Sequence, residues 1–147
     1  MKSVEAEIEI KASPGMIISA FTDPRMLKDW WGVERHLIQL KQGGLYSLAW
    51  NISKSGFGYV STGIVREYKA DKKLHIEDFA YFNPERDILG PMSLLITASA
   101  TSQGSVLYIC QDGYQQGADW EWYHQAVQQA WPKALESIKN YIESQEG

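Results

Sequence analysis

Three histidines, one cysteine and scattered carboxylates are the side chains of this 147-residue chain that could catalyse a reaction or bind a metal. His36, His75 and His124 lie in separate segments, without the His-x-His or His-Glu-x-x-His spacing that places two imidazoles on one ion. Cys110 has no second cysteine to pair with, and its strand-like surroundings are typical of a small buried hydrophobic residue. We therefore expect no metal site, no cofactor and no catalytic cysteine.

Several carboxylates lie on predicted strands, and two of them could form a catalytic acid–base pair. Most of them are expected to point to solvent. Asp78 and Asp112 are the exceptions to consider, because strand alternation puts them in phase with Ile76 and Tyr108. A carboxylate that faces apolar side chains has a raised pKa and can serve as an acid or base. We assign no catalytic residue, and we expect binding rather than enzymatic activity.

Aromatic residues are the more distinctive feature, since the chain has six tryptophans and eight tyrosines. Several of them share one face of a predicted strand or helix, and concave apolar walls with a few hydroxyl and indole donors suit a lipophilic ligand. The alternative is that the same side chains simply fill the core, and a single β-bulge would reverse the facing of every side chain beyond it. The residues expected to line a ligand-binding cavity are Trp31, Tyr46, Leu48, Trp50, Phe79, Tyr81, Tyr108, Tyr114, Tyr123, Val127 and Trp131.

The first elements that must position these residues are one strand and two short helices. Residues 3–11, SVEAEIEIK, alternate apolar and charged side chains, which predicts a strand with one buried face. The Ser-Pro pair at 13–14 and the Asp-Pro pair at 23–24 each combine a capping side chain with a proline suited to the first helical position. The second helix is expected to end near Gly32.

The middle of the chain reads as strands joined largely by hairpin turns, and the order predicts one antiparallel sheet of about seven strands. The strands assigned there are 45–52, 57–68, 74–82, 92–100 and 105–112. From Ala118 to about Ser144 the apolar spacing changes to threes and fours, which predicts a long helix. Pro132 either interrupts this helix, at a cost of about 3 kcal/mol, or begins a second one. A bent helix that wraps a curved sheet is the preferred interpretation.

Charge and composition exclude several classes of partner. The net charge is −4 and no block of basic residues occurs, so neither nucleic acid nor an anionic membrane surface is an expected partner. No apolar run approaches the roughly 18 residues that a membrane span requires. The N-terminal residues do not resemble a signal peptide, and a single cysteine fits a reducing compartment. We expect a cytoplasmic protein with one domain over 1–147.

Several motifs resemble those of a known superfamily. They are FTDPRMLKDWWG, KQGGLYSL, TGIVREYKADKKL, GSVLYICQDGY and AWPKALESIKNYIE. Together they are similar to the START-like or SRPBCC superfamily, and most similar to small single-domain homologues of the activator of the heat-shock-protein-90 ATPase. The resemblance implies an α+β helix-grip fold, also called birch-pollen-allergen-like, in which a curved antiparallel sheet grips the C-terminal helix. It also implies that the two short helices close one end, and that a hydrophobic cavity often separates sheet and helix.

Three functions remain open at this point. The first is an intracellular binding module that holds a hydrophobic, aromatic or lipid-like small molecule between the sheet and the C-terminal helix. The second, implied by the resemblance, is contact with a chaperone. The third is an enzyme of the aromatase or cyclase kind found elsewhere in the superfamily, which would need acid–base residues that face the cavity.

Overall fold

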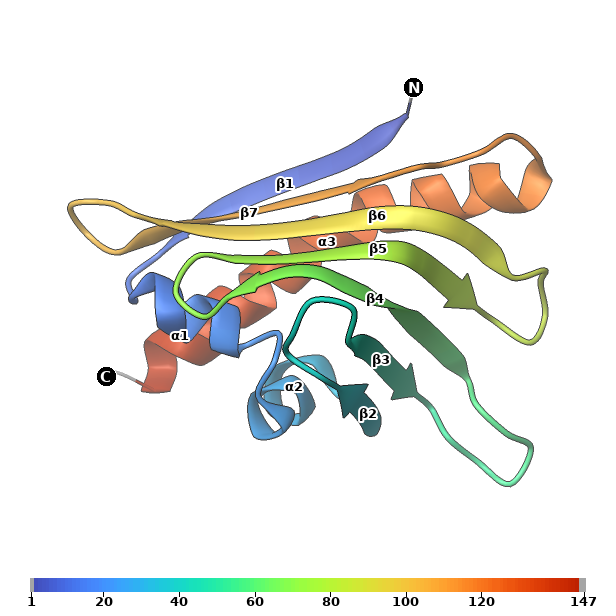
Figure 1. Ribbon diagram of the computed structural model, residues 1–147, viewed down its shortest axis with the longest axis horizontal. Helices are drawn as coiled ribbons and strands as arrows, with labels where there is room; N and C mark the ends of the chain where they lie inside the picture. The colour runs from blue at the N-terminus through green and yellow to red at the C-terminus, as the bar shows by residue number, and fades with distance from the viewer. Residues whose placement is uncertain (1, 146–147) are drawn as a thin grey trace.

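The computed structural model describes residues 2–145, and within them one antiparallel sheet and three helices are seen (Figure 1). The strand order across the sheet is β1-β7-β6-β5-β4-β3-β2. The strands are β1 Ser3–Ile10, β2 Arg35–Ile38, β3 Leu45–Trp50, β4 Tyr59–Lys69, β5 Lys73–Phe82, β6 Leu89–Ala100 and β7 Ser105–Asp112. The helices are α1 Pro14–Ser19, α2 Pro24–Trp31 and α3 Ala118–Gln145. This architecture confirms the predicted helix-grip fold.

Local signals in the sequence determine where the two short helices begin and end. The Ser13 hydroxyl accepts a hydrogen bond from the Met16 N–H, 3.2 Å away, and so caps α1. Asp23 caps α2 in the same way, accepting from the N–H of Met26 at 3.2 Å. Gly32 ends α2 with φ of 72°, a left-handed conformation that glycine adopts without strain. These start and stop positions agree with the prediction.

Strand β2 was not assigned to residues by the sequence pattern. It is a four-residue edge strand whose first three side chains are exposed, so it lacks the alternation that reveals a half-buried strand. Its backbone pairs antiparallel with β3, from Arg35 opposite Ala49 to Ile38 opposite Tyr46. At the other edge β1 pairs with β7, from Ser3 opposite Asp112 to Ile10 opposite Ser105.

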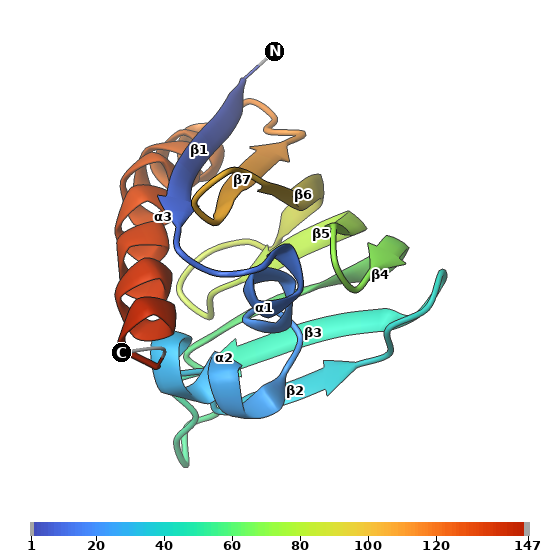
Figure 2. The same cartoon turned by 90° about the vertical axis from the view of Figure 1, so that its left-hand side faces the viewer.

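Helix α3 is a single helix that contains Pro132, so the alternative of a second helix beginning at that proline is wrong. The sheet curves around α3, which lies along β1 (Figure 2). Its buried stripe is Tyr123, Val127, Trp131, Leu135, Ile138 and Ile142. At the end of the helix the Lys139 ammonium donates to the Glu9 carbonyl at 2.9 Å, and the Glu143 carboxylate accepts from the Lys11 N–H at 3.0 Å. These contacts attach the last turns of α3 to the end of β1.

A β-bulge in β5 changes which side chains face the core. The pairing of β5 with β6 shifts register between Ile76 and Phe79, and Asp78 has φ of 50°. Ile76 and Phe79 are both buried although three positions separate them, whereas Asp78 is exposed. The strand phase read from Ile76 therefore does not continue to Asp78.

The described residues 2–145 include no helix that is both long and apolar enough to span a membrane.

Candidate functional site

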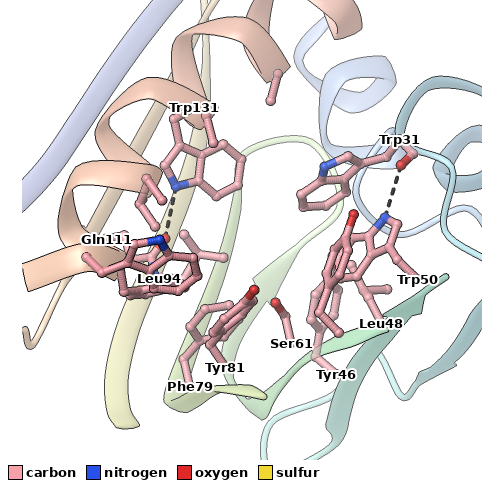
Figure 3. A pocket seen from close by; sticks show the side chains of 17 residues that line it. Trp31, Tyr46, Leu48, Trp50, Ser61, Phe79, Tyr81, Leu94, Gln111 and Trp131 are labelled. Atoms are coloured by element: carbon pink, nitrogen blue, oxygen red, sulfur yellow. Dashed lines mark hydrogen bonds between the residues drawn. The ribbon is translucent and has the colours of Figure 1, made fainter. Parts of the chain in front are cut away.

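A cavity of about 250 Å³ lies between the sheet and α3, with α2 at one end (Figure 3). Its walls are almost entirely apolar and aromatic, and no charged side chain occurs among the described residues that line it. The lining residues are Trp31, Tyr46, Leu48, Trp50, Tyr59, Ser61, Phe79, Tyr81, Leu94, Gln111, Trp122, Tyr123, Ala126, Val127, Ala130, Trp131 and Ala134.

Six of the aromatic rings form a continuous series around the cavity, which we call the aromatic belt. In order it consists of Trp131, Trp31, Trp50, Tyr59, Tyr81 and Tyr123. Successive ring centroids lie 5.8, 5.2, 5.1, 6.5 and 4.6 Å apart in that order. These distances are those of favourable aromatic pairs, so each ring supports the next. The belt joins α2, three strands of the sheet and α3.

Gln111 of β7 closes the belt between its two ends. The Trp131 indole N–H donates to the Gln111 side-chain oxygen at 2.9 Å (Figure 3). The Gln111 amide nitrogen donates to the Tyr123 hydroxyl, also at 2.9 Å. The Gln111 side chain is only 2% exposed, so both bonds are made out of bulk water. A buried amide is stable only when its polar atoms are paired.

Two further wall residues are fixed by backbone carbonyls. The Trp50 indole N–H donates to the Trp31 carbonyl at 3.0 Å, and the Tyr46 hydroxyl donates to the Phe21 carbonyl at 2.6 Å. Burial raises the pKa of the Tyr46 phenol far above its ordinary value, so this group stays a neutral donor. The wall is thus held in place before any ligand arrives.

The two tryptophans at the end of α2 have different roles. Trp30 and Trp31 stack with centroids 4.7 Å apart and planes 11° from parallel, and both are half-buried. The Trp30 indole N–H donates to the Ala20 carbonyl at 2.7 Å, which ties α2 to the end of α1. Trp31 lies on the cavity side of the stack and lines the cavity. Trp30 therefore packs against Trp31 on the side away from the cavity.

Small side chains mark the part of α3 that borders the opening of the cavity. Ala126, Ala130 and Ala134 recur every four residues and so lie on one face of the helix. Ala126 and Ala130 line the cavity and are also exposed to solvent. Their methyl groups leave the rim open where longer side chains would cover it.

An ion pair fixes the loop after β5 against the first turns of α3. The Arg86 guanidinium lies 2.9 Å from the Asp119 carboxylate, and its central carbon is 3.8 Å from the ring centroid of Trp122. Trp122 lines the cavity and is partly exposed. The salt bridge and the cation–π contact together hold this edge of the site.

All but two of the residues expected to line the cavity do line it. These are Trp31, Tyr46, Leu48, Trp50, Phe79, Tyr81, Tyr123, Val127 and Trp131. Their role in binding a ligand stays a prediction.

Tyr108 and Tyr114 were expected to line the cavity, and they do not. Tyr108 lies on the outer face of β7, where its hydroxyl donates to the Glu5 carboxylate. Tyr114 is buried behind the belt, with its ring 4.9 Å from that of His124 and 6.0 Å from that of Tyr123. Its hydroxyl is buried without a hydrogen-bond partner in the described part of the chain.

The cavity residues that the sequence analysis missed are Tyr59, Ser61, Leu94, Gln111, Trp122, Ala126, Ala130 and Ala134. Gln111 could have been found, because it continues the alternation of Leu107 and Ile109 along β7. The opposite phase of the same strand, which contains Tyr108, is also rich in hydrophobic residues. Alternation alone therefore did not decide which face of β7 points inward.

The candidate acid–base residues do not face the cavity. Asp78 lies in the bulge of β5 and borders a separate, polar pocket of about 260 Å³ with Arg66 and Glu77. Asp112 has the same phase as Tyr108 on the outer face of β7. Among the histidines, His75 lies 2.9 Å from the Ser93 hydroxyl. Residues 2–145 contain no cluster of three or more metal-ligating side chains.

Comparisons with known proteins agree with this architecture. The family model described as Activator of Hsp90 ATPase homolog 1-like protein matches residues 11–143. A protein of Mesorhizobium loti has a similar solved structure, with a TM-score of 0.76 and 17% identity, covering 97% of this chain and 98% of that one. The solution structure of the Aha1 dimer from Colwellia psychrerythraea has a TM-score of 0.73 and 16% identity, with full coverage of both chains.

A third similar structure is that of a protein from the dynemicin biosynthetic locus. It has a TM-score of 0.72 and 14% identity, and the match covers 97% of this chain but 48% of the other. At such low identities the likeness shows a shared fold alone. No curated protein sequence matches the chain significantly.

Proposed function

The chain belongs to the family of Activator of Hsp90 ATPase homolog 1-like proteins, and we propose that it is a binding module for a hydrophobic or aromatic small molecule. The ligand occupies the cavity between the sheet and α3. The observation that carries this proposal is an apolar cavity of about 250 Å³ that stays open although large aromatic side chains surround it.

Protein interiors are normally packed to the density of organic crystals. An empty apolar cavity reduces stability in proportion to its volume, because the side chains around it lose packing contacts. Here the aromatic belt is held by Gln111 and by backbone carbonyls, so the walls are prevented from closing on one another. A ligand with an apolar surface restores the missing contacts and gains the free energy of leaving water.

The test uses the rim of the cavity. N-phenyl-1-naphthylamine, an uncharged dye that emits when it leaves water, is expected to bind with a dissociation constant of about 1 μM, equivalent to about −8 kcal/mol. Replacing the exposed rim residue in Ala130→Trp covers the opening with an indole, and should weaken dye binding at least about tenfold.

Gln129→Trp is the matched control, because Gln129 is the neighbouring exposed residue of α3 and does not line the cavity. It should bind the dye as the native protein does. Equal affinity of the native protein and both variants would place the dye outside the cavity and contradict the proposal.

Contact with a chaperone and an aromatase-like or cyclase-like activity stay predictions, and the chemistry of the cavity walls favours neither.

A further inference from the structure

The polar atoms in the cavity indicate which class of molecule it accepts, an inference that rests on the proposed function. We propose that the ligand is an uncharged, planar aromatic compound with a carbonyl oxygen, and that this oxygen accepts hydrogen bonds from Ser61 and Tyr81.

Most polar atoms of the wall are already paired within the protein. The Gln111 side-chain oxygen accepts from Trp131, and its nitrogen donates to Tyr123. The indole N–H of Trp50 and the hydroxyl of Tyr46 donate to backbone carbonyls. The one amide oxygen of the wall thus already accepts a hydrogen bond, and no carboxylate lines the cavity among the described residues.

The polar groups left without an acceptor among the described residues are donors, namely hydroxyls and the indole N–H groups of Trp31 and Trp122. Ser61 of β4 and Tyr81 of β5 are directly opposite each other in the sheet. Both side chains line the cavity, and Figure 3 shows them pointing into it. The Tyr81 oxygen accepts a 3.4 Å bond from the Asn83 amide, which leaves its O–H to donate. The Ser61 hydroxyl makes no hydrogen bond to another described residue and can rotate to donate as well.

Tyr123 adds a third donor next to this pair. Its ring stacks on that of Tyr81 with centroids 4.6 Å apart, and its oxygen accepts from Gln111, so its O–H is free. Burial raises the pKa of the Tyr123 phenol, so the group keeps its proton at neutral pH. An acceptor oxygen on the ligand is the complement of such a set of donors, since a buried donor without a partner is unfavourable.

The absence of charge among the described wall residues argues for an uncharged ligand. An ionised carboxylate or phenolate would lose its hydration without gaining a counter-ion, and the protein as a whole carries a net charge of −4. A cation would meet aromatic faces, which attract it, but the free hydroxyl protons would then be left without an acceptor. The aromatic belt favours flat rings, and the cavity volume suits two or three of them.

Four naphthalene probes of similar size test the inference by calorimetric titration. They are 2-acetylnaphthalene, its hydrocarbon isostere 2-isopropenylnaphthalene, the anion 2-naphthoate and the cation 2-naphthyltrimethylammonium. The acetyl compound is expected to bind most tightly, about tenfold more tightly than the isostere, because two hydrogen bonds to its oxygen are gained.

Variants of the proposed donors test whether Ser61 and Tyr81 cause the preference for the acetyl compound over its isostere. Ser61→Ala combined with Tyr81→Phe should abolish the tenfold preference for the acetyl compound over the isostere. Thr62→Val is the matched control, because it removes a hydroxyl from the next residue of β4, which faces away from the cavity. The control should keep the preference.

The outcomes separate the two proposals. If the acetyl compound and its isostere bind equally, or if either ion binds most tightly, the inference is wrong and the proposed function stands. The inference is also wrong if the double variant keeps the preference. If none of the four probes binds, the inference and the proposed function are both wrong.

Discussion

Gln111 shows how a single polar residue can organise an apolar site. Its amide is buried and pairs with one aromatic residue through its oxygen and with another through its nitrogen. The two partners, Trp131 and Tyr123, lie two turns apart on α3, so the amide also fixes the helix against β7. A hydrophobic residue at this position could not do both.

The first prediction concerns this amide. Gln111→Leu keeps most of the side-chain volume but leaves the buried Trp131 N–H without an acceptor, so the free energy of unfolding should fall by about 1–3 kcal/mol. Urea denaturation of both proteins measures this change. In a double-mutant cycle with Trp131→Phe the two losses should be less than additive, because the second change removes the unpaired donor. Strict additivity would mean that the hydrogen bond does not couple the two residues.

The inward orientation of Gln111 could not be predicted from strand alternation alone. Both faces of β7 carry hydrophobic side chains, Leu107 and Ile109 on one and Tyr108 and Cys110 on the other. A rule that assigns aromatics to the cavity therefore selected Tyr108. The pairing of the Tyr108 hydroxyl with Glu5 on β1 became visible only once the two strands were placed side by side.

At the level of elements, α3 accommodates a proline inside a continuous helix. Pro132 is exposed, while Trp131 before it and Leu135 one turn later are buried. The contacts of these buried neighbours offset the hydrogen bond that the proline cannot donate to the Gln128 carbonyl. Packing on the sheet, and not local propensity, therefore keeps this turn helical.

A second prediction follows for Pro132→Ala. The change restores the missing N–H and a strong helix former at an exposed site, so the free energy of unfolding should rise by about 1–3 kcal/mol. Thermal and urea denaturation measure it. Lys133→Ala, a change at the next exposed residue, should shift stability by less than about 0.5 kcal/mol. A loss of stability in Pro132→Ala would show that the proline is needed to seat Trp131 on the sheet.

Most elements were predictable because their signals are local. The caps at Ser13 and Asp23 and the stripe of α3 depend on residues within a few positions of one another. Strand β2 and the bulge at Asp78 were not predictable in this way. The edge strand owes its conformation to pairing with β3, and the bulge depends on the register between β5 and β6. Both are long-range effects that a linear pattern does not encode.

For the molecule as a whole, the aromatic belt links α2, the sheet and α3 into one core. We propose that the chain is one domain and unfolds in a single cooperative transition. In urea, the far-ultraviolet dichroism of the backbone and the near-ultraviolet dichroism of the aromatic rings should then change at the same midpoint. Loss of the aromatic signal at a lower urea concentration would show that α3 and the sheet separate before either unfolds.

The pairing of β1 with β7 has a consequence for how the protein is made. Translation adds about 5–20 residues per second, so β1 is synthesised roughly 5–20 s before its partner strand. During this interval Val4, Ile8 and Ile10 have no sheet to cover them, and an unpaired apolar strand can associate with other nascent chains. Glu5, Glu7 and Glu9 alternate with the apolar residues of β1 and remain exposed in the folded protein. We expect the mutual repulsion of these carboxylates to disfavour association of the unpaired strand with other nascent chains.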